Sequence, residues 1–61
     1  MNKVVEILME RDGMTKKEAQ EVFENVKSQL HEAAGTGSYA LCEEIMYSEL
    51  GLEMDYILDI L

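Results

Sequence analysis

Residues 15–35 read TKKEAQEVFENVKSQLHEAAG, and the spacing of their apolar side chains decides the fold. The apolar residues recur at intervals of three and four, the period of an amphipathic α-helix. They are Ala19, Val22, Phe23, Val26, Leu30 and Ala33. Thr15 followed by Glu18 forms a capping box at the start, and Gly35 is a natural left-handed stop. We therefore predict a helix over about 16–34.

The other predicted helices have the same two marks, a polar cap at the start and a glycine at the end. These marks are Asn2 and Gly13 for a helix over about 3–11, and Ser38 and Gly51 for a helix over about 39–50. A short helix over about 54–60 follows. The prediction is an all-α fold: a compact bundle of three main helices plus a short C-terminal helix, in a single domain over 1–61.

Charge is distributed unevenly along the chain. The basic residues all lie at or before Lys27, whereas the part from Ser28 to Leu61 has seven acids and no lysine or arginine, and so carries −7 of the net charge of −8. A one-sided negative field favours a basic partner. The candidate partner-binding face consists of the acids of the last two predicted helices: Glu43, Glu44, Glu49, Glu53, Asp55 and Asp59.

The residue types argue against enzyme activity. One histidine and one cysteine do not make a zinc site, and no acidic loop has the spacing of a calcium site, so we expect no metal and no cofactor. Cys42 is followed by Glu43 and Glu44, so it lacks the electropositive surroundings that a nucleophilic thiol needs. His31 is near the end of the long helix, where it suits the helix dipole. We expect no catalytic residues.

Direct nucleic-acid binding and membrane binding are also not expected. Lys16, Lys17 and Lys27 are interleaved with glutamates on the same helix, so they form no basic stripe for phosphates. Glu6 interrupts the first apolar run, and no stretch approaches the length of a membrane span. With a single cysteine that cannot form an internal disulfide, the composition predicts a cytoplasmic protein.

The C-terminal segment is apolar over most of its circumference, which suggests a second kind of interface. Such a helix is buried on several sides or docks on another surface. A second copy of the chain would supply core that one small domain lacks. The candidates for self-association are Tyr56, Ile57, Ile60 and Leu61.

Three segments resemble one group of proteins: Thr15–Ala19, the loop Gly35–Ser38, and the segment Leu50–Leu61. They are similar to short acidic helical proteins of bacteriophages and prophages of Gram-positive bacteria. The chain departs from that pattern at Met54, which is often proline there, and in a less acidic loop around Gly35. Most members have no assigned activity, so the resemblance supplies no functional residues.

Two functions therefore stand side by side as predictions. The first is a non-catalytic protein-binding module that places its acidic face on a basic surface of another protein. If the chain has a phage origin, this module would be an inhibitor in the host cytoplasm. It would compete with DNA for a basic surface of a host protein, as small anti-CRISPR-like inhibitors do. The second is a self-associating assembly module that uses the apolar C-terminal helix. The two are compatible with each other.

Overall fold

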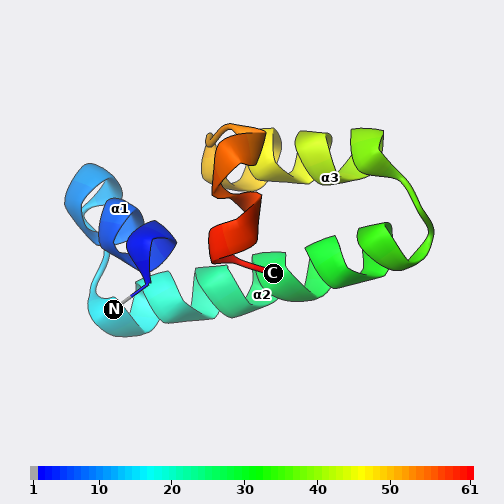
Figure 1. Ribbon diagram of the computed structural model, residues 1–61. Helices are drawn as coiled ribbons and strands as arrows, with labels where there is room; N and C mark the ends of the chain where they lie inside the picture. Colours follow the sequence, from blue (N-terminus) through cyan, green and yellow to red (C-terminus); the bar gives the residue numbers. More distant parts are fainter. Residues whose placement is uncertain (1) are drawn as a thin grey trace.

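The structure, a computed structural model, describes residues 2–61 and is helical along most of that length (Figure 1). The elements in chain order are α1 (Lys3–Asp12), α2 (Lys16–Gly35), α3 (Tyr39–Ile45), the π-helix η1 (Met46–Leu50) and the 3-10 helix η2 (Met54–Asp59). Taking α3 and η1 together, every predicted boundary is correct to within one residue. The all-α bundle is confirmed.

The long helix α2 is the base on which the other elements pack. In Figure 1, α3 runs back above α2 in the opposite direction, and α1 lies across the beginning of α2. The C-terminal segment comes down from the end of η1, passes between α1 and α3, and ends against α2. The C-terminal segment is therefore brought back to the long helix.

Side-chain caps explain where the regular helices begin. The Asn2 side chain accepts a hydrogen bond from the backbone N–H of Val4 at 2.8 Å. At the start of α2, the Thr15 hydroxyl accepts from the Glu18 N–H at 3.1 Å, and the Glu18 carboxylate accepts from the Thr15 N–H at 2.9 Å. The capping box is thus complete, and the Thr15 backbone hydrogen bond lowers the pKa of Glu18.

Glycine ends two of the helices as predicted, but the end of α2 differs. Gly13 and Gly51 adopt left-handed φ values of 67° and 64°. Gly35 instead remains inside α2, and the left-handed residue is Gly37, with φ 75°. The predicted role of Gly35 is therefore wrong. The helix ends at Gly35, and the hydroxyl of its C-cap Thr36 donates to the Ala33 carbonyl at 2.8 Å before the chain turns.

The C-terminal helices are not regular α-helices, and contacts from α1 hold them. The Arg11 guanidinium donates to the Leu50 carbonyl at 2.7 Å, at the end of η1, where a cation is favourable. It also forms a bidentate pair with Asp12, which raises the pKa of Arg11 and lowers that of Asp12. The Asn2 amide donates to the backbone carbonyl of Asp59 in η2.

One hydrophobic core joins all of these elements. Its buried members are Val4, Val5, Leu8, Ala19, Val26, Leu30, Ala33, Cys42, Ile45, Met46, Leu50 and Ile60. The radius of gyration is 11.0 Å, close to the ~10.5 Å expected for a folded chain of this length. None of the helices in residues 2–61 has the length and apolar character needed to cross a bilayer.

Candidate functional site

The candidate site is a groove of about 450 Å³ between α3–η1 and the segment that leads into η2. We call it the acidic groove. Its lining residues are Ala40, Glu43, Glu44, Tyr47, Leu52, Glu53 and Met54. The three glutamates are exposed, and Tyr47 is 78% exposed. The groove therefore combines carboxylates, one aromatic ring and an apolar floor.

Two local features build this groove. Ala40, Glu43, Glu44 and Tyr47 are spaced at i, i+3, i+4 and i+7, which aligns them along one face of a helix. The left-handed turn at Gly51 then reverses the chain, with the Gly51 N–H donating to the Tyr47 carbonyl at 2.9 Å. This turn brings the residues that follow it, including Glu53, back to the same face.

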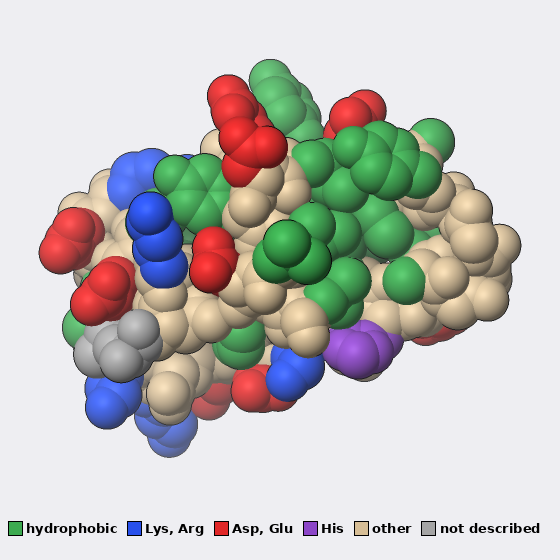
Figure 2. Space-filling model, in the orientation of Figure 1, with side chains coloured by type: hydrophobic (Ala, Val, Ile, Leu, Met, Phe, Trp, Pro, Cys, Tyr) green, Lys and Arg blue, Asp and Glu red, His purple; other side chains and the backbone are tan. Residues whose placement is uncertain are grey.

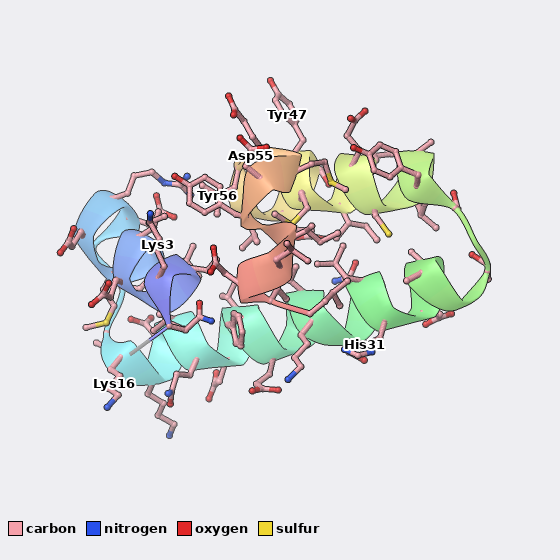
Figure 3. All side chains as sticks on the ribbon, viewed as in Figure 1. Lys3, Lys16, His31, Tyr47, Asp55 and Tyr56 are labelled. Carbon is pink, nitrogen blue, oxygen red and sulfur yellow. The ribbon has the colours of Figure 1, made fainter. Side chains whose placement is uncertain are left out.

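The figures show how exposed this surface is. In Figure 2, acidic side chains flank an apolar one at the edge of the molecule where Figure 3 labels Tyr47. The Tyr47 ring points away from the body of the protein. An aromatic ring that projects between carboxylates is accessible to a partner and has no role in the core.

The other predicted acids are divided among different surfaces. Glu49 of η1 lines a separate groove together with residues of α2. These residues are Glu21, Val22, Asn25, Val26 and Gln29. Asp55 is exposed in the first turn of η2, directly after Met54. The side chain of Asp59 is exposed at the end of η2, where its backbone carbonyl accepts a hydrogen bond from Asn2, the N-cap of α1. The structure thus brings Glu43, Glu44 and Glu53 together and does not bring Glu49 or Asp59 to them.

The residues predicted for self-association also separate. Ile60 is only 3% exposed and belongs to the core, which corrects the prediction for that residue. Tyr56 is half-buried, with the Lys3 ammonium 5.7 Å from its ring centroid, a cation–π distance that Figure 3 lets the reader follow. Ile57 and Leu61 line an apolar groove, which shares Met54 with the acidic groove.

The two residues considered for chemistry have unremarkable surroundings. Cys42 is buried in the core, and His31 is exposed on α2. Within residues 2–61, no three His, Cys, Asp or Glu side chains are grouped as metal ligands would be. The expectations that the protein is not an enzyme and has no cofactor remain predictions.

Sequence reasoning missed the apolar floor and the residue that supports it. Leu52 and Met54 lie under the acids because the Gly51 turn folds them there. Arg11 fixes the end of η1 from α1, with its Nη1 atom 3.5 Å from where a side chain on Gly51 would begin. The contact spans 39 residues of sequence, so no local pattern could have revealed it.

Comparison with protein-family models, curated proteins and solved structures gave no match, so the candidate site rests on its own geometry.

Proposed function

We propose that this protein is a non-catalytic protein-binding module that holds a basic surface of another protein in the acidic groove. The observation that carries the proposal is the convergence of Glu43, Glu44 and Glu53 around an exposed Tyr47. Acids on a merely solubilising surface have no reason to surround an exposed aromatic ring and an apolar floor.

The composition of the groove suits arginine and lysine side chains. Both have a long apolar stem and a charged head. The stem would lie on Leu52 and Met54, and the head would reach the carboxylates. A guanidinium can pair with a carboxylate in bidentate geometry and stack on a ring such as Tyr47.

The charge of the whole chain supports the same partner class. The C-terminal part from Ser28 carries almost all of the net charge of −8. Such a field accelerates encounter with a basic surface, and it loses strength as salt rises. It also repels nucleic acid, so the partner we propose is a protein surface that would otherwise hold DNA or RNA.

This chemistry is compatible with an inhibitor of a host protein, which is the function we expect if the chain has a phage origin. A module that covers a nucleic-acid-binding surface of a host protein would compete with the polyanion that normally occupies it. The proposal requires only the groove and the charge, and it stands whether or not the chain has a phage origin.

The test compares two variants with equal net charge. The groove variant carries Glu43→Gln, Glu44→Gln and Glu53→Gln. The control carries Glu10→Gln, Glu24→Gln and Glu32→Gln, at exposed positions on α1 and α2. Glutamine has nearly the same helix propensity as glutamate, so both variants should fold and have equal circular dichroism.

The measurement is binding of a fluorescent peptide of alternating arginine and serine, by anisotropy at about 0.05 M and 0.5 M salt. We expect the groove variant to bind about tenfold more weakly, since each lost contact contributes roughly 0.5 kcal/mol, and the control to lose much less. Equal losses in the two variants would mean that only net charge matters, and would refute the groove as a site.

A further inference from the structure

The acidic groove contains one aromatic ring, and that ring lies one helical turn from two of the carboxylates. Tyr47 follows Glu43 by four positions and Glu44 by three, and all three side chains line the groove. The ring is 78% exposed and points away from the body of the protein (Figure 3). A partner side chain that lies on this ring is therefore also within reach of the two glutamates.

The chain itself supplies no cation to this ring or to these carboxylates. Within residues 2–61, the only ion pair joins Arg11 to Asp12, and the only contact of a cation with an aromatic ring joins Lys3 to Tyr56. All lysines and arginines of the chain precede α3 in the sequence. The ring of Tyr47 and the neighbouring carboxylates therefore remain available to a cation from a partner.

We propose that the acidic groove selects arginine over lysine, and that Tyr47 is the residue that determines this selectivity. The inference rests on the proposed function, which requires a basic partner but does not distinguish between the two side chains. It narrows the partner to a protein segment that presents an exposed arginine.

The shapes of the two cations account for the selectivity. The arginine guanidinium is planar, and its five N–H groups point outward in that plane. One face can therefore stack on the Tyr47 ring while the edge donates to the carboxylates of Glu43 and Glu44. A lysine ammonium is compact and strongly hydrated, and its three N–H groups diverge. An ammonium above the ring therefore loses more hydration and directs fewer donors to the carboxylates.

The other two tyrosines lack this combination. Tyr39 is 67% exposed, but it lines the apolar groove between the end of α2, the start of α3 and the C-terminal segment, which no aspartate or glutamate lines. Tyr56 is half-buried, and the Lys3 ammonium already lies over its ring. Tyr47 alone has an exposed ring beside glutamates, and Tyr39 is therefore the natural control for it.

The test compares two fluorescent peptides of equal length and equal net charge, one of alternating arginine and serine and one of alternating lysine and serine. Anisotropy at about 0.05 M salt measures the two Kd values. Diffuse attraction to an acidic chain treats the two peptides alike, because it depends on charge alone. We expect the wild-type chain to bind the arginine peptide about tenfold more tightly than the lysine peptide.

A matched pair of variants tests the role of the ring. Tyr47→Leu removes the ring from the acidic groove, and Tyr39→Leu removes one from the apolar groove. Both side chains are exposed, so both variants should fold, and circular dichroism checks this. We expect Tyr47→Leu to reduce the arginine preference to about twofold, the part due to bidentate pairing, and Tyr39→Leu to keep it at about tenfold. Tyr47→Phe, which keeps the ring, should retain the preference.

Three results would overturn the selectivity. They are equal binding of the two peptides by the wild-type chain, an arginine preference that survives Tyr47→Leu, and a preference that Tyr39→Leu reduces as much as Tyr47→Leu does. A failure of the proposed function is a different result: the groove variant and its charge-matched control would lose the arginine peptide equally, and both proposals would then be wrong.

Discussion

Residues 2–35 and residues 36–61 hold their helices in different ways. In the first part, α1 and α2 are regular α-helices whose starts are capped by side chains close in sequence. In the second part, α3 begins with the same kind of local cap, at Ser38, but η1 is a π-helix, η2 is a 3-10 helix, and neither of these two has a side-chain cap. Instead, η1 accepts a hydrogen bond from Arg11 of α1, and η2 accepts one from Asn2, the N-cap of α1. Within residues 2–61, the last two helices therefore receive hydrogen bonds from the N-terminal part of the chain, which α3 does not.

This difference coincides with the placement of the candidate surfaces. The acidic groove is built wholly from residues 40–54, and the apolar groove mainly from residues 37–61. Irregular helices are frequent at functional sites, because their turns place side chains where a regular helix would not. Residues 2–35 contain the long helix on which the other elements pack, and residues 36–61 contain the acidic groove that we propose as a binding surface.

The largest expected effect tests whether the two parts share one core. Met46 is fully buried although it belongs to the irregular η1. Met46→Ala should cost about 2–5 kcal/mol, which approaches the whole stability of a small domain. We expect thermal unfolding by circular dichroism to show both parts losing structure together. Loss of the C-terminal helices alone, with α1 and α2 intact, would show that the parts are independent.

A smaller effect should follow from removing one hydrogen bond between the two parts. Arg11→Ala removes the hydrogen bond to the Leu50 carbonyl, and because the side chain is partly exposed we expect a loss of about 1 kcal/mol. Amide hydrogen exchange should accelerate in residues 46–60 more than in α2. Lys17→Ala, on the exposed face of α2, is the control and should leave exchange unchanged. If hydrogen exchange accelerated equally over the whole chain, Arg11 would have no particular role in holding the C-terminal helices.

The smallest effect concerns the junction between the parts. Gly35 is helical and a side chain there would meet open space, so Gly35→Ala should stabilise the protein by roughly 0.5–1 kcal/mol. Gly37 has a positive φ, so Gly37→Ala should destabilise it by about 1 kcal/mol. Chemical denaturation measures both. If Gly35→Ala destabilised the protein and Gly37→Ala stabilised it, Gly35 would be the left-handed residue after all.

Much of the fold could be predicted because its signals are local. The Thr15–Glu18 capping box and the stops at Gly13 and Gly51 involve neighbouring residues, and the structure confirms them. The type of the last two helices could not be predicted, since it depends on packing and on distant contacts such as Arg11 with Leu50. Gly35 and Gly37 are two residues apart, and both suit a left-handed stop, so the sequence could not choose between them.

The candidate site could be predicted only in part. Glu43 and Glu44 have the spacing that aligns them with Tyr47 along one helical face. Glu49 turns toward α2 because successive helical residues differ in direction by about 100°, and charge alone does not reveal that separation. Ile60 is buried because the C-terminal segment folds back on its own chain, a tertiary event without a local signal.

The most direct measurement is an NMR titration of the labelled chain with the arginine–serine peptide at low salt. If the acidic groove is the binding site, chemical-shift changes should concentrate at Ala40, Glu43, Glu44, Tyr47, Glu53 and Met54, and should vanish at about 0.5 M salt. The amide chemical shifts of Glu10, Glu24 and Glu32 should remain unchanged. Shifts spread over the acids of every helix would show diffuse charge attraction and would contradict a specific binding surface.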